Sequence, residues 1–213
     1  DQIRVCMMDV LSDSIKEEEI VEGMQADEEE AEQGEIEYDE HVWLSFDNAS
    51  IVVSYIADAL GTMNEAGREQ YITRAEEYAS RLNDMRVAYE GKMAGRTKDT
   101  IIVADRFPFR YLVDEFGVKY YAAFPGCSAE SESSFETIVF LIEKARESEV
   151  GNIYIIENAD DKLASTIADN CPDDIDILVL DSMQSVTVED IEAGASYIGY
   201  MTDNMEALLT GLL

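Results

Sequence analysis

The sequence has few of the residues from which many metal and nucleotide sites are built. It contains one histidine, one tryptophan, three prolines and three cysteines, and no Cys-x-x-Cys pair. A zinc–cysteine cluster is therefore not expected, and at most one disulfide can form. No glycine-rich phosphate loop is present, and no nucleophile lies at a plausible spacing from a base, so a hydrolase is not indicated.

Other absences concern membranes and positive charge. No apolar run is long enough for a membrane helix, and no signal peptide is visible. Lys and Arg number 15 against 47 Asp and Glu, which gives a net charge of −32. Such a surface repels nucleic acid and anionic lipid, so neither is an expected partner. We interpret most of these carboxylates as serving solubility.

The length of 213 residues suits one large domain or two small ones, and the 46% of hydrophobic residues is enough for a sizeable core. The densest acidic block is residues 13–37. Like charges at this density are usually solvated, so a disordered loop is expected there, with weak attraction for cations at best.

The only histidine and the only tryptophan lie within residues 38–46. Asp39 and Glu40 precede His41, and an apolar run follows it. An imidazole beside a carboxylate can bind a metal ion while the acid orients the ring. The alternative is a capped loop anchored by a buried Trp43, and a lone histidine does not decide between the two.

Two helices are expected after this segment. The first spans residues 47–61 and ends at Gly61. Its apolar face holds Ile51, Val52, Tyr55, Ile56 and Leu60. The second spans about residues 64–93, with a stripe of Tyr71, Ala75, Tyr78, Leu82, Met85 and Tyr89. At ~1.5 Å per residue the second helix would be about 40 Å long, and its period alone permits a coiled-coil partner.

From Lys98 onward, short apolar strands alternate with helices, which is typical of a parallel sheet. Strands are expected at residues 100–104, 118–124, 152–156 and 175–180. Helices are expected at residues 108–116, 133–148 and 160–170, and a last helix presents Ile191, Ala195, Ile198, Met201, Met205 and Leu208 on one face. The opening residues 3–8 are interpreted as a strand.

Three of these strands end on an acid, at Asp105, Glu157 and Asp181. Because the carboxyl ends of parallel strands share one edge of the sheet, the three carboxylates should converge on one cleft. Like charges in a cleft raise each other's pKa, and a divalent cation relieves this. Each acid alone could instead cap the next helix. For the three together we prefer a cation site, which Glu130 and Glu132 could also reach.

One stretch carries a family resemblance. Asp-Glu-His-Val-Trp-Leu-Ser, residues 39–45, resembles the Asp-Pro-His-Xaa-Trp-Leu motif of the metal-binding solute-binding proteins of zinc and manganese ABC transporters (cluster A-I). The resemblance implies that His41 is a metal ligand, with Glu40 in place of the usual proline. Leu180-Asp181-Ser182-Met183 resembles the family's final ligand segment, which implies that Asp181 also binds the metal.

Two further positions follow from this resemblance, which runs from about Asp9 to the end of the chain. Residues 103–112 and then Phe116-Gly117-Val118 are similar to a stretch in which the family has a His or Glu ligand. Counting back from Gly117 puts Arg106 on that position. Since arginine cannot bind a cation, Asp105 is the candidate. Glu157 matches an acid that the family commonly has after the third strand. It is expected to support the ligands without binding the metal, and direct binding is the alternative.

The resemblance implies an α/β fold of two lobes with parallel sheets joined by a long helix. Residues 1–63 would be the remainder of the N-terminal lobe with the acidic loop, residues 64–93 the connecting helix and residues 94–213 the C-terminal lobe. Family members carry a signal or lipoprotein sequence and more of the first lobe ahead of this stretch. The chain is therefore expected to be truncated or processed, with an incomplete N-terminal lobe and without the family's first histidine ligand.

The implied function is capture of a divalent transition metal outside the cytoplasm, in the periplasm or as a surface lipoprotein, and delivery to the permease of an ABC importer. The protein is expected to be a monomer and not an enzyme. Imidazole favours Zn²⁺ and carboxylates favour Mn²⁺, and we expect zinc with manganese as the alternative. The rivals are a Mg²⁺-dependent phosphoryl-transfer domain, for which no lysine follows a strand end, and an acidic cell-surface adhesion protein.

Overall fold

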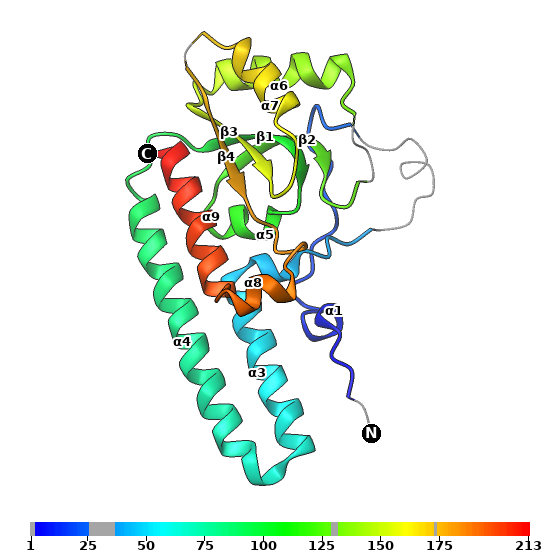
Figure 1. Ribbon diagram of the computed structural model, residues 1–213, viewed down its shortest axis with the longest axis vertical. Coiled ribbons are helices and arrows are strands. Elements are labelled where there is room, and N and C mark those ends of the chain that lie inside the picture. Colours follow the sequence, from blue (N-terminus) through cyan, green and yellow to red (C-terminus); the bar gives the residue numbers. More distant parts are fainter. Residues whose placement is uncertain (1–2, 26–36, 129–131, 173) are drawn as a thin grey trace.

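The computed structural model describes residues 3–25, 37–128, 132–172 and 174–213. An α/β body is built on one sheet, and a hairpin of two long helices, α3 (Phe46–Met63) and α4 (Arg68–Met93), projects from it (Figure 1). The two helices pack along each other and are joined by a 3₁₀ turn, η2 (Glu65–Gly67). No helix within the described ranges has the length and hydropathy needed to cross a membrane.

The sheet has four parallel strands in the order β2-β1-β3-β4. Their bounds are β1 Thr100–Phe107, β2 Lys119–Pro125, β3 Asn152–Ile156 and β4 Asp176–Leu180. The predicted α/β class with a parallel sheet and a long helix is confirmed. Before α3, the described residues contain only an isolated bridge between Glu17 and Tyr38 in place of strands, so the division into two lobes stays a prediction.

Strand β1 is longer than predicted. Its pairing with β2 shifts register between Val103 and Arg106, and the strand continues to Phe107. Asp105 therefore lies within β1 at the irregularity and not beyond its end, because the bulged segment still pairs with β2. Its Oδ1 accepts a hydrogen bond from the backbone N–H of Arg106 at 2.8 Å.

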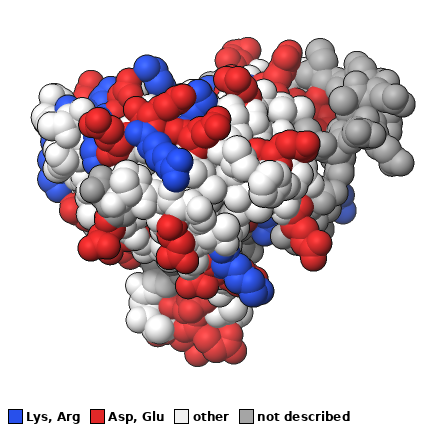
Figure 2. Space-filling view, turned by 90° about the horizontal axis from the view of Figure 1, so that it is seen from above, with Lys and Arg blue, Asp and Glu red and all other residues white. Residues whose placement is uncertain are grey.

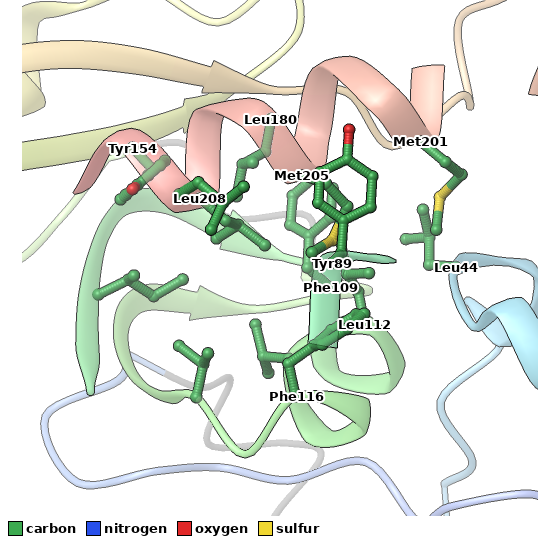
Figure 3. Packing of buried hydrophobic residues seen from close by; sticks show 14 of the residues in the cluster. Leu44, Tyr89, Phe109, Leu112, Phe116, Tyr154, Leu180, Met201, Met205 and Leu208 are labelled. Atoms are coloured by element: carbon green, nitrogen blue, oxygen red, sulfur yellow. The ribbon is translucent and has the colours of Figure 1, made fainter. Parts of the chain in front are cut away.

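Helices cover both faces of the sheet (Figure 1). On one face lie α6 (Phe135–Glu147) and α7 (Lys162–Asp169); on the other lie α5 (Arg110–Glu115) and α9 (Tyr197–Leu212). Figure 3 shows the core of the second face, where Leu112 and Phe116 lie near Met205 and Leu208, and Tyr89 of α4 joins them. The end of α4 is thereby anchored in the body, whereas its beginning lies at the tip of the hairpin.

Helix α4 agrees with its predicted pattern. Ala75, Leu82 and Tyr89 of the apolar stripe are buried, together with Met93. The opposite side is exposed along Arg74, Glu77, Arg81 and Asp84. The helix begins at Arg68 and not at residue 64, because the preceding residues form the η2 turn.

Helix α3 buries a different side from the one predicted. Of the five residues on the expected face only Val52 is buried. The other four are between 41% and 48% exposed: Ile51, Tyr55, Ile56 and Leu60. The small side chains of Ala49, Ala57 and Gly61 are buried instead. The helix also continues past its predicted end at Gly61 to Met63. An added Cβ at Gly61 would lie 2.7 Å from Cγ of Arg68, so the close approach of α4 there favours glycine.

Two other predictions are wrong. Residues 3–8 form no strand, and a short helix, α1 (Met7–Val10), begins there. The expected last helix is two helices, α8 (Val188–Glu192) and α9, because Gly194 adopts φ = +101° and Ser196 starts α9 as its N-cap. Thr187 and Asp190 form a capping box at the start of α8.

Candidate metal centre

His41 is buried, with 2% of its surface exposed, at the entrance to a 3₁₀ turn, η1 (Val42–Leu44). Asp39 Oδ1 accepts hydrogen bonds from the backbone N–H of His41 and from its ring Nδ1, both at 2.9 Å. A carboxylate on Nδ1 keeps the proton there and leaves the lone pair on Nε2. The acid-oriented imidazole predicted from the sequence is therefore present, with Asp39 as the acid.

The backbone around His41 is tied to three other parts of the chain. The Tyr111 hydroxyl of α5 donates to the carbonyl of Asp39 at 3.0 Å. The Tyr197 hydroxyl of α9 donates to the carbonyl of Trp43 at 2.7 Å. The Trp43 indole N–H donates to the carbonyl of Ser182 at 2.9 Å, which joins the segment to the loop after β4. These bonds hold the ring in one place relative to the sheet.

The start of α3 is held by a carboxylate from α5. Glu115 accepts hydrogen bonds from the backbone N–H groups of Phe46 and Asp47, each at 3.0 Å, and from the Ser45 hydroxyl at 2.9 Å. A carboxylate at this position satisfies N–H groups that a helix leaves unpaired at its N-terminus. Burial raises the pKa of Glu115. The link fixes the exit of the His41 segment to the body.

Nε2 of His41 contacts Gln184. The Gln184 side-chain nitrogen lies 2.9 Å from it. Sequence reasoning missed this residue, because an exposed amide in a loop has no local pattern that marks it as a neighbour of a histidine far away in the chain.

Glu157, which follows β3, and Asp181, which follows β4, both bind the backbone of the loop after β4. Glu157 accepts from the backbone N–H of Ser182 at 2.8 Å and from its hydroxyl at 2.5 Å. Asp181 accepts from the backbone N–H of Met183 at 2.7 Å, and its own N–H donates to the Asn204 side chain. Burial raises the pKa of Asp181, and the nearby Glu157 raises it further.

The capping alternative for the strand-end acids is wrong. The N-cap residues of α5, α7 and α8 are Phe109, Asp161 and Thr187. The carboxylate of Asp105 accepts instead from the backbone N–H of Arg106 at the bulge of β1, and those of Glu157 and Asp181 accept from backbone N–H groups of the loop after β4.

A cavity of ≈ 970 Å³ opens at this edge, between the ends of β1 and β3 and the helices α6 and α7. Asp105 and Glu157 line it, whereas His41 and Asp181 do not. Burial raises the pKa of Asp105. Within the described ranges, no group of three or more His, Cys, Asp or Glu residues is placed to hold a metal ion. The four candidate ligands are thus not gathered into one coordination sphere here, and their ligation stays a prediction.

Other residues at this edge include two cations. Arg106 lines the cavity, with its Nε 3.9 Å from Asp105 Oδ1. Lys162, which follows no strand end in the sequence, lines it too because α7 begins there, but its Nζ is paired with Asp160 at 2.7 Å. Glu132 also lines the cavity. Glu130 and residues 26–36 of the predicted acidic loop lie outside the described residues. Residues 13–25 of that loop are described and not disordered: the N–H of Lys16 donates to the Tyr111 hydroxyl at 2.9 Å, and the N–H of Gln25 donates to the carbonyl of Ala123 at 2.9 Å.

Charge on the face above α6 and α7 is mixed. Acidic side chains are spread over the whole visible surface in Figure 2, and basic ones gather toward one side. The net charge of −32 is therefore not concentrated in one patch on this face. Such general acidity attracts cations to the molecule without selecting one of them.

Known proteins resemble the chain over most of its length. The profile of the family described as "Zinc-uptake complex component A periplasmic" (ZnuA) matches residues 6–211. Identity is 32% to the zinc-binding lipoprotein AdcA of Streptococcus pneumoniae, over 81% of this chain and 34% of AdcA. Identity is 29% to the high-affinity zinc uptake system protein ZnuA of Bacillus subtilis, over 82% of this chain and 54% of that protein.

The fold matches as well. The crystal structure of the Zn(II)-bound ZnuA-like domain of Streptococcus pneumoniae AdcA superposes with a TM-score of 0.66 at 30% identity, covering 82% of this chain and 64% of that one. The chain spans about a third to a half of the length of the two curated relatives. The predicted resemblance is confirmed, and the chain belongs to the zinc-uptake complex component A (ZnuA) family.

Proposed function

We propose that the protein captures Zn²⁺ outside the cytoplasm and delivers it to the permease of an ABC importer. The observation that carries the proposal is the geometry of His41: a buried imidazole whose Nδ1 is held by Asp39, with the Nε2 lone pair left for a ligand. His41 belongs to the motif, residues 39–45, by which the sequence resembles metal-binding solute-binding proteins. The family description as a periplasmic zinc-uptake component and the zinc-binding names of relatives support zinc over manganese.

The four candidate residues have different proposed roles. His41 and Asp181 bind the ion, and Asp105 adds a third donor in the place where Arg106 cannot. Glu157 holds the loop that carries Asp181 through its two hydrogen bonds to Ser182. Imidazole and carboxylate together form the kind of nitrogen and oxygen set that Zn²⁺ accepts.

The wider organisation is part of the same proposal. Residues 1–63 belong to an N-terminal lobe, residues 64–93 contain the connecting helix and residues 94–213 form the C-terminal lobe. The protein acts as a monomer, and nucleic acid is not a partner because the net charge of −32 opposes it. It binds and releases its cargo without a chemical step. Lys162 at the sheet edge is neutralised by Asp160, which does not favour the phosphoryl-transfer alternative.

Metal analysis of the purified full-length protein tests the proposal, followed by competition titrations with zinc and manganese. We expect one zinc ion per chain and tighter binding of zinc than of manganese. Tighter manganese binding would overturn the choice of metal. Absence of specific binding of either ion would overturn the transport role, and phosphatase activity dependent on Mg²⁺ would favour the enzymatic alternative.

A further inference from the structure

The nitrogen of His41 that would face a metal ion is already occupied. Asp39 accepts a hydrogen bond from the Nδ1–H group, which keeps the proton on Nδ1 and makes Nε2 an acceptor. The Gln184 side-chain nitrogen lies 2.9 Å away, within the range for a donated N–H hydrogen bond. The amide of Gln184 and an incoming cation therefore compete for the same lone pair.

Gln184 also separates His41 from solvent on the side of the cavity. It lines the cavity at the carboxyl edge of β1 and β3, whereas His41 does not, although the two side chains touch. Asp105 and Glu157 line the same cavity. Because carboxylates attract a cation into this space, the cavity leads from solvent to the outer side of the Gln184 amide.

Apart from its contact with His41, Gln184 makes long contacts: its backbone N–H lies 3.3 Å from the Ser182 hydroxyl and its Oε1 lies 3.4 Å from the same hydroxyl. Gln184 is exposed, and the neighbouring Met183 adopts φ = +61°, a conformation that costs energy for a residue other than glycine. The loop is tied down by Ser182, through Glu157 and Trp43. Asp181 lies at the start of this loop and accepts from the N–H of Met183, so a candidate ligand is bonded to the residue next to Gln184.

We propose that Gln184 is the gate of the metal site: its amide caps Nε2 of His41 in the metal-free protein, and a cation arriving through the cavity must displace it. The inference rests on the proposed function. The capped state is unable to bind, so the apparent affinity is lowered by the fraction of molecules that are capped. Gln184 thus lowers the affinity for every cation by the same factor.

Removal of the cap tests the proposal. Zinc affinity, by competition with a chromophoric chelator, and the association rate, by stopped flow, are measured on the full-length wild type, Gln184→Ala and Gln184→Asn, whose shorter amide does not reach the ring. Gln70→Ala on the exposed side of α4 is the matched control. Because one hydrogen bond is removed, we expect both Gln184 variants to bind zinc about two- to tenfold more tightly and faster. Unchanged or weaker binding would overturn the gate.

A second measurement does not depend on affinity. The Gln184 side-chain amide signals, assigned in the NMR spectrum by their loss in Gln184→Ala, should shift when zinc saturates the wild type, because the bond to His41 breaks. Signals that stay in place at saturation would overturn the gate while leaving the proposed function intact. If neither the wild type nor Gln184→Ala binds zinc, the proposed function fails and the gate with it.

Discussion

His41 and the carboxylates at the sheet edge belong to one candidate site, yet they are held in different ways. The ring is buried and bonded to a buried acid, and its backbone neighbours are tied to α5 and α9. Asp105 and Asp181 are only partly buried, and their carboxylates accept from backbone N–H groups one and two residues ahead of them. The histidine is therefore preset, whereas the acids depend on a bulge and a loop that can adjust around an ion.

This difference assigns separate tasks to the two parts. A ligand that is already oriented loses little freedom on binding, so it should dominate the affinity. Ligands on adjustable loops should close the site and report the arrival of the ion. Each of the following experiments tests that division.

The largest effect is expected for His41→Ala. Loss of a ligand exceeds the ~10–100-fold typical of groups that only support a ligand, so zinc affinity should fall by more than about 100-fold in the full-length protein. The control neutralises the acids within residues 27–32, which lie outside the described residues. A greater loss in that control than in His41→Ala would show that the preset imidazole is not the dominant ligand.

The acids should differ from each other. Asp181→Ala should weaken zinc binding by more than about 100-fold, whereas Glu157→Ala, which removes only the support of the loop, should cost ~10–100-fold. Both affinities are measured by the same competition titration. Equal losses, or a greater loss for Glu157→Ala, would mean that the loop and not the carboxylate of Asp181 matters.

Asp39→Asn should lower the zinc affinity by ~10-fold or somewhat more, a loss comparable to or smaller than that of Glu157→Ala. The reason is that the ring stays in place, but its proton is no longer held on Nδ1 by a carboxylate. The ¹⁵N shifts of the His41 ring in the metal-free protein report the change of tautomer. Asp84→Asn on the exposed side of α4 is the control. Unchanged ring shifts would show that Asp39 does not orient the imidazole.

The smallest effect is expected for the overall dimensions of the protein when zinc binds. Helix α4 is continuous from Arg68 to Met93, contains no proline, and has its only internal glycine, Gly91, near its end. A sharp kink normally needs proline, glycine or a bulge, so the helix should resist bending. Solution scattering of the full-length protein with and without zinc should therefore show little change in radius of gyration. A large decrease on adding zinc would mean that the lobes close by a hinge.

Much of the C-terminal half could be predicted from the sequence. The four strands lie close to their predicted positions, since buried apolar runs and the turns that end them are local signals. The capping box at Thr187 and the buried stripe of α4 are of the same kind. The orientation of His41 by Asp39 also follows from neighbours two residues apart in the chain.

Predictions failed where a local sequence pattern was compatible with more than one way of packing. An apolar face on α3 could be recognised, but the small residues on another side allow the close approach to α4, so the large side chains stay exposed. A continuous period across residues 191–208 concealed the break at Gly194, because a glycine conformation is decided by how the flanking helices pack.

The four strands, helix α4, the acid–imidazole pair and the family could be read from the sequence alone, because each depends on residues close together in the chain or on a whole pattern of them. Three features came only from the folded chain: Glu115 binds the N-terminus of α3, Asp105 lies inside β1, and Gln184 covers the ring of His41. The physical reason is distance along the chain: Gln184 and His41 are separated by 143 positions, and a contact between such residues is set by the packing of whole elements.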